Sequence, residues 1–216
     1  KNYVGINQSI LMRAGSIIST KSVAGNIVAE ANVDEEFPVE FALYDLNEFL
    51  NTIKLFKSPI LDFSEAENNF LSICEEDNLD FKGKYTFANK EHIKYPERRA
   101  VLENPSVCFK LDAETLNSIT KASSIMQLPN MTIVPIDEGH VQIEVSDVKD
   151  RSSNKFSIAL DAEAPKDSKF KLIYKMDNIK ILPGEYEVRI NGEMKRSSFE
   201  SDLIDYFIGL ELNSRF

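Results

Sequence analysis

The sequence contains the same strand-to-helix corner twice. Phe41–Leu55 reads FALYDLNEFLNTIKL, and Leu172–Leu182 reads LIYKMDNIKIL. In each segment a short apolar strand ends in a tyrosine, Tyr44 or Tyr174, and passes directly into an amphipathic stretch. The recurrence predicts two copies of one fold, with chance similarity of a single corner as the alternative.

The order of elements around each corner supports two copies. In the first half, apolar runs broken at Ala14-Gly15 and Ala24-Gly25 predict a meander of consecutive hairpins. Residues 59–87 contain the strand candidates PILDF, FLSICEE, LDF and KYTF, which we expect to extend and end that sheet. A second sheet is predicted by VCFKL, by the hairpin MTIVPIDEGHVQIEVSD with its turn at Asp137 to Gly139, by KFSIAL, and by a final hairpin from GEYEVRI to DYFIGLEL.

Two segments have the period of amphipathic helices. LNEFLNTIKLF follows Asp45, and Asp45 with Glu48 three residues later resembles a capping box. DAETLNSITKASSIM has a similar pattern, and the stretch after Tyr174 predicts a further helix. The residues expected on the buried sides are Leu46, Phe49, Leu50 and Ile53 in the first helix, and Leu116, Ile119 and Met126 in the second.

A connector separates the two halves. The stretch HIKYPERRAVLENPS, His92 to Ser106, has two prolines, a charge run and no sustained period. We therefore predict an α+β protein with a first domain at residues 1–91, a connector at 92–106 and a second domain at 107–216.

Composition limits the compartment. No apolar run approaches the roughly 20 residues that span a bilayer, and the start KNYVGINQ lacks the apolar core of a signal peptide. Cys74 and Cys108 are the only two cysteines, so neither a disulfide framework nor a paired-cysteine metal site is expected. We expect a soluble protein of a reducing compartment, without a membrane partner and with further residues upstream of Lys1.

The net charge of −10 argues against simple adhesion to nucleic acid, because such affinity comes mainly from Lys and Arg at phosphates. A single-strand-binding groove with basic and aromatic residues interleaved is also absent from the sequence. The acidic runs at Asp34 to Glu36 and Glu75 to Asp77 lack calcium-loop spacing and are interpreted as solvated turns.

Few sequence features support an enzyme. The eight glycines never form a GxGxxG or Walker loop, and His92 and His140 lie outside the HExxH pattern. We expect no cofactor and no bound metal. A hydrolase that uses Cys108 with His140 as a nucleophilic pair stays open as the alternative.

Four segments resemble the sliding clamps of T-even-type tailed bacteriophages. They are INQSILMRAG, VAEANV, ALYDLNEFL and the ending DYFIGLELNSRF, in the order and spacing of that family. The similarity covers nearly the whole chain and is weaker at residues 59–99 and 147–169. In that family the first helix begins before the position of Lys1.

The resemblance implies a ring of three chains joined head to tail, with two similar domains per chain, antiparallel sheets outside and two helices per domain lining a central hole. Duplex DNA passes through the hole, and the clamp performs no chemistry. The resemblance implies that the ring tethers the replicative DNA polymerase in the cytoplasm of the bacterial host. It also implies that an ATP-driven clamp loader opens and closes the ring, and that late transcription factors bind it.

The resemblance also assigns roles to residues. Cations gathered on the bore would leave the outer surface acidic, since a topological tether needs only weak phosphate contacts. A partner peptide would enter an apolar pocket near the connector. The expected DNA-facing residues are Lys54, Lys57, Asn117, Lys121, Lys175 and Lys180, and the expected partner-binding residues are Val28, Val101, Leu102, Ile208 and Leu210.

The joint between chains is expected to pair two strand edges. An edge strand near KYTF in the first domain would pair with KFSIAL in the second domain of the next chain.

Overall fold

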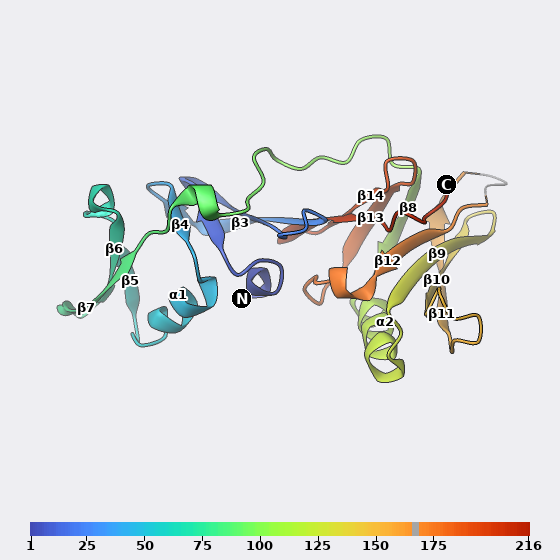
Figure 1. The fold of residues 1–216 in the computed structure, drawn as a ribbon, viewed down its shortest axis with the longest axis horizontal. Coiled ribbons are helices and arrows are strands. Elements are labelled where there is room, and N and C mark those ends of the chain that lie inside the picture. The colour runs from blue at the N-terminus through green and yellow to red at the C-terminus, as the bar shows by residue number, and fades with distance from the viewer. Residues whose placement is uncertain (166–168) are drawn as a thin grey trace. The chain divides into compact units, whose positions relative to one another are not determined.

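The computed structural model describes residues 1–165 and 169–216. The chain forms two compact units, Lys1–Arg98 and Arg99–Phe216 (Figure 1). The division falls inside the predicted connector, whose residues 94–106 contain no helix or strand. No helix among the described residues is long and apolar enough to cross a membrane.

The first unit begins with two separate strand pairs. β1 (Ile10–Met12) pairs with β4 (Phe41–Leu43), whereas β2 (Gly15–Lys21) pairs with β3 (Ile27–Phe37). The prediction of consecutive hairpins was therefore wrong at its first turn, because β1 does not pair with the strand that follows it. Gly15, at φ +104°, permits the sharp change of direction that separates β1 from β2.

A three-stranded antiparallel sheet completes the first unit. It consists of β5 (Pro59–Asp62), β6 (Phe70–Glu75) and β7 (Asn78–Thr86), in that order. Two expectations are corrected here. LDF and KYTF belong to one strand, β7, and the three strands form a sheet of their own, hydrogen-bonded to no strand of the preceding pairs.

The helix α1 (Leu46–Ile53) confirms the first corner. Asp45 is its N-cap, and its Oδ1 accepts a hydrogen bond from the Glu48 N–H at 2.9 Å. Leu46 and Phe49 are buried, and the Phe49 ring meets the Tyr85 ring edge-on at 5.0 Å. The short 3₁₀ helices of this unit are η1 (Asn2–Gly5), η2 (Ala66–Asn68) and η3 (Lys90–His92).

The described part of the second unit is one antiparallel sheet with a helix against it. Its strands are hydrogen-bonded in the order β12-β9-β10-β11-β8-β13-β14-β15. The strands are β8 (Val107–Leu111), β9 (Asn130–Asp137), β10 (His140–Ser146), β11 (Phe156–Glu163), β12 (Leu172–Lys175), β13 (Tyr186–Asn191), β14 (Arg196–Glu200) and β15 (Ile204–Gly209).

The predicted hairpin around Asp137 to Gly139 is confirmed by β9 and β10, and VCFKL and KFSIAL are strands. The ending was predicted as one hairpin and is a three-stranded meander, because β14 lies between β13 and β15. β14 reads RSSFE, and a single large apolar residue gave it no recognisable period.

The helix α2 (Ala113–Met126) packs against β10 and β11. Asp112 caps it by accepting a hydrogen bond from the Thr115 N–H at 2.7 Å. Leu116 and Ile119 are buried as expected, but Met126 is 37% exposed and Ala122 takes the third buried position. The prediction for Met126 was wrong because the last turn of α2 is exposed, with Ile125 beside it 79% exposed.

The amphipathic stretch after Tyr174 does not form an α-helix. It is the 3₁₀ helix η4 (Met176–Asn178). Asp177 and Asn178 favour turns, and Pro183 follows too closely for a longer helix. The second corner therefore repeats the strand and its exit but shortens the helix to one turn.

Candidate functional site

The first group of predicted DNA-facing residues follows α1. Lys54 is the exposed C-cap residue, and its Nζ donates a hydrogen bond to Asn51 Oδ1 at 2.7 Å. The backbone N–H of Lys57 donates to Glu75 Oε2 at 2.9 Å, while the residue itself is exposed. Both lysines therefore lie close together at one end of the helix, available to solvent.

The second group lies on α2. Asn117 and Lys121 are exposed and four residues apart, so they share one face of the helix, away from the buried Leu116 and Ile119. The helix presents an amide and an ammonium group there, both of which can donate hydrogen bonds to phosphate oxygens.

The third group surrounds η4. Lys175 ends β12 and forms an ion pair with Glu211, Nζ to Oε2, at 3.5 Å. Lys180 is exposed two residues after η4. The ion pair offsets the charge of Lys175, which makes it the weakest member of the predicted set. Contact between these six residues and DNA stays a prediction.

The predicted partner-binding residues differ in accessibility. Val101 is 70% exposed in the irregular segment before β8, and Leu102 beside it is half-buried. Val28 in β3 is half-buried. Ile208 and Leu210 are 1% and 8% exposed, at and just beyond the end of β15, so they can only contribute the floor of a pocket. Peptide binding by the five stays a prediction.

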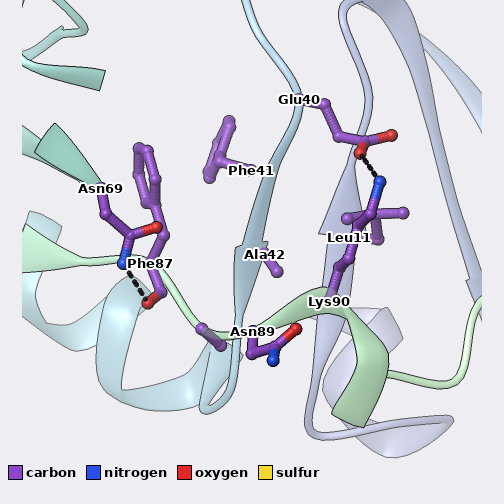
Figure 2. A pocket seen from close by; sticks show the side chains of 9 residues that line it. Leu11, Glu40, Phe41, Ala42, Asn69, Phe87, Asn89 and Lys90 are labelled. Atoms are coloured by element: carbon purple, nitrogen blue, oxygen red, sulfur yellow. Dashed lines mark hydrogen bonds and ion pairs between the residues drawn. The ribbon is translucent and has the colours of Figure 1, made fainter. Parts of the chain in front are cut away.

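The structure shows a cavity that the sequence interpretation missed. A pocket of about 350 Å³ in the first unit is bounded by Leu11, Phe41, Ala42, Phe87 and Ala88 (Figure 2). An ion pair between Lys90 and Glu40, 3.1 Å long, lies at one side of it. No short motif marks this site, because it joins segments that are distant in sequence: the Ala88 N–H donates to the Ala42 carbonyl at 2.8 Å, and Ala88 packs against the cluster that contains Leu11 and Ala42.

The Cys108–His140 alternative is not supported by the geometry. Nδ1 of His140 contacts Asp137 Oδ1 at 2.5 Å, and its Nε2 contacts Asp161 Oδ1 at 3.3 Å. Both ring nitrogens are therefore engaged by carboxylates. Burial and the nearby Glu163 raise the pKa of the Cys108 thiol, which disfavours the nucleophilic thiolate. Among the described residues no group of His, Cys, Asp and Glu is arranged to hold a metal ion.

Among the strand edges that lack a complete strand partner in the described part of the chain are those of β7 and β11. β7 ends its sheet and is hydrogen-bonded to β6 alone. β11 pairs with β10 along its length, but its other edge meets β8 only at Ala162 and Glu163. That edge of β11 is therefore open from Phe156 to Asp161.

Comparisons with known proteins agree with this architecture. Residues 108–212 match the family model described as "gp45 sliding clamp, C terminal". The chain is 31% identical to the sliding clamp of Vibrio phage KVP40 over 98% of this chain and 94% of that protein. It is 29% identical to the sliding clamp of Escherichia phage RB69, over 99% of this chain and 93% of that one.

A solved structure shows the same fold at low identity. The proliferating cellular nuclear antigen of Entamoeba histolytica superposes with a TM-score of 0.70 at 10% identity, covering 98% of this chain and 92% of that one. The similarity therefore extends over both units of the chain.

Proposed function

The chain belongs to the sliding clamps of T4-like phages, and on that premise we propose that it forms a ring around duplex DNA and tethers the replicative DNA polymerase for processive synthesis. The observation that carries this proposal is the 31% identity to a sliding clamp over 98% of the chain, because it includes both units. The clamp fold of the structural relative supports it independently of close sequence similarity.

The charge distribution suits a topological tether. With a net charge of −10, the surface as a whole repels phosphate, and residence on DNA must come from enclosure. Exposed Lys54, Lys57, Lys121 and Lys180 lie on or beside helical segments, where they can make the few transient phosphate contacts that sliding requires.

A head-to-tail trimer is the assembly that we propose for the ring. The open edges of β7 and β11 give each chain two different surfaces, so that β7 of one chain can pair with β11 of the next. A closed ring of head-to-tail contacts needs two such surfaces. Pairing them would also remove two strand edges that favour aggregation when left exposed.

Further partners follow from the same premise. We propose that an ATP-driven clamp loader opens and closes the ring, that transcription factors use it late in infection, and that it acts in the cytoplasm of the bacterial host. In this role the protein performs no chemistry of its own. Its apolar peptide pocket would involve Val28, Val101, Leu102, Ile208 and Leu210.

The test is a primer-extension assay on primed circular DNA with the cognate polymerase, its loader and ATP. A trap of excess primed template limits synthesis to one binding event. We expect product length to increase when the clamp is added, and to fall on a linear template with free ends. Equal product lengths with and without the clamp would overturn the proposed function.

A further inference from the structure

The open edge of β11 has a different chemistry on each face. The side chains alternate, so Phe156, Ile158 and Leu160 are half-buried on the face toward α2. Asp161 and Glu163 are exposed on the opposite face, together with the neutral Ser157 and Ala159. Within β11 itself, this outer face therefore carries two carboxylates and no lysine or arginine, while His140 of the neighbouring β10 contacts Asp161.

The open edge of β7 has the same division of faces with the opposite charge. The ring centres of Phe81 and Phe56 are 5.2 Å apart, and the Tyr85 ring contacts the Phe49 ring of α1. These aromatic side chains therefore lie on the face that α1 covers. Lys82 and Lys84 alternate with them and are exposed on the outer face. Asp80 shares that outer face, but it lies at the irregular end of the ladder between β6 and β7.

We propose that the joint between neighbouring chains is set by charge, with Lys82 and Lys84 on β7 of one copy facing Asp161 and Glu163 on β11 of the next. This inference rests on the proposed ring. Antiparallel pairing with Lys82 opposite Asp161 places Lys84 diagonally across from Asp161 and Glu163 diagonally across from Lys82. Glu163 is already paired with Cys108 of β8, so the new ladder ends at Asp161 and does not reach Asp80. The same register places Tyr85 opposite Ile158, so apolar side chains meet on the inner face.

The charges also specify which edges join. Two β11 edges would bring the carboxylates of both strands together, with no lysine or arginine on that face of either strand. Two β7 edges centred on Gly83 would place Lys82 opposite Lys84, and like charges directly opposite destabilise a strand pair. Of these three pairings, only the β7–β11 joint matches opposite charges and apolar faces at once, which favours head-to-tail assembly.

Three of the four side chains, those of Asp161, Lys82 and Lys84, belong to exposed residues whose contacts lie at the surface. The Asp161 side chain is 96% exposed, and its contact with His140 Nε2 is at 3.3 Å. The Lys84 Nζ lies 4.0 Å from the centre of the Phe70 ring. Hydrogen bonds from Ser64 lower the pKa of the Asp62 carboxyl, and the charge of Lys82 adds to this effect. These intrachain contacts are weak surface interactions, which a second chain can supplement.

The test uses three charge-reversal variants of the full chain. The first carries Lys82→Glu and Lys84→Glu, the second carries Asp161→Lys and Glu163→Lys, and the third carries all four changes. Each double reversal places like charges across every joint, and we expect it to weaken self-association at least about tenfold in analytical ultracentrifugation. The third variant should regain the trimer mass of the unmodified chain.

Mixing the two double variants gives a sharper result. Each can join only the other, so a ring of three always contains one mismatched joint. We expect the mixture to form open species in which the two variants alternate, starting from pairs with one copy of each. That association also shows that both variants are folded, and circular dichroism checks each alone.

Three results would overturn the charge-set joint: trimers from either double variant at the concentration where the unmodified chain is trimeric, no recovery in the quadruple variant, or closed trimers in the mixture. A failure of the proposed function looks different, since the unmodified chain would then not increase product length in primer extension. The joint is also expected to weaken as salt rises from 0.05 to roughly 0.5 M, because screening shortens the range of surface charges.

Discussion

Tyr44 follows the last residue of β4 and Tyr174 is the second-last residue of β12, yet Tyr44 is 72% exposed and Tyr174 is completely buried. Tyr174 pairs with Met131 in the register of β12 with β9, and its ring meets Phe199 edge-on at 6.1 Å. The same residue type in the same sequence context therefore has a core role in one unit and a surface position in the other.

Replacing these two tyrosines should separate the roles. Tyr174→Ala removes a completely buried ring and should reduce the free energy of unfolding by about 3–5 kcal/mol, the range for large aromatic truncations. Tyr44→Ala should change it by less than about 0.5 kcal/mol, as expected for surface substitutions. Urea denaturation measures both, and Tyr174→Phe is the matched control that keeps the ring. Equal losses at the two positions would contradict this assignment.

The sequence predicted those elements whose signal is local. Asp45 was identified as a cap before a regular apolar period, and α1 begins directly after it. The period of DAETLNSITKASSIM was recognised as well, and α2 begins directly after Asp112. The turn at Gly139, with φ +89°, was marked by the glycine itself. Strand partners were harder to predict, because β1 pairs with β4 through buried residues on both strands, and no local pattern encodes that choice.

The residues of the candidate site also differ in whether a local sequence signal identifies them. Exposed lysines on helices can be recognised from a helical period, and Lys54 and Lys121 are exposed as expected. The pocket beside Leu11 and Phe87 and the two carboxylates around His140 were missed, because they join segments that are distant in sequence. Such groupings depend on tertiary packing, which a single sequence does not show.

The cap of α1 gives a second measurable effect. Asp45→Ala removes the hydrogen bond to the Glu48 N–H and should cost about 1 kcal/mol of unfolding free energy, because a helix N-terminal donor loses its partner. Asp45→Asn, which retains an acceptor oxygen, should cost much less. Chemical denaturation of the three proteins tests this, and equal destabilisation by Ala and Asn would exclude the capping role.

The pair of carboxylates around His140 predicts a pH effect. Asp137 foremost, and then Asp161, raise the pKa of His140 above its ordinary value. A raised pKa in the folded state stabilises the fold fully below the unfolded-state pKa of about 6.5, and this contribution is lost as pH rises through the folded-state pKa. Asp137→Asn should lower the His140 titration midpoint in an NMR experiment, and Asp161→Asn should lower it less. An unchanged midpoint in both would refute the ion pairs.

The predicted DNA-facing lysines can be tested together. Replacing Lys54, Lys121 and Lys180 by alanine should reduce loading or sliding while the trimer mass stays unchanged. Each lost phosphate contact should reduce the log–log salt slope of binding by about one unit. A variant with Lys90, Lys149 and Lys155 replaced carries the same charge change at positions outside the predicted set. Equal losses in both triple variants would show that total charge, and not position, matters.

The peptide pocket provides the last prediction. Leu102 is half-buried in the segment before β8, where an aliphatic side chain can anchor a partner peptide, and binding energy concentrates in such anchors. Leu102→Ala should therefore weaken binding of the polymerase C-terminal peptide by about 2 kcal/mol or more in calorimetry. Ile208 is 1% exposed, so the small truncation Ile208→Val tests whether this residue forms the floor of the pocket. We expect it to lower the free energy of unfolding by about 1 kcal/mol and also to weaken peptide binding.

The control for that experiment is Leu203→Ala. Leu203 is 76% exposed at the turn before β15, so its truncation removes similar apolar surface outside the predicted pocket. Each variant is first confirmed as a trimer by sedimentation, because a dissociated ring could lose peptide affinity for an unrelated reason. Unchanged affinity in Leu102→Ala and Ile208→Val would place the peptide site elsewhere on the ring, whereas a loss in Leu203→Ala of equal size would show that the effect is not specific to the pocket.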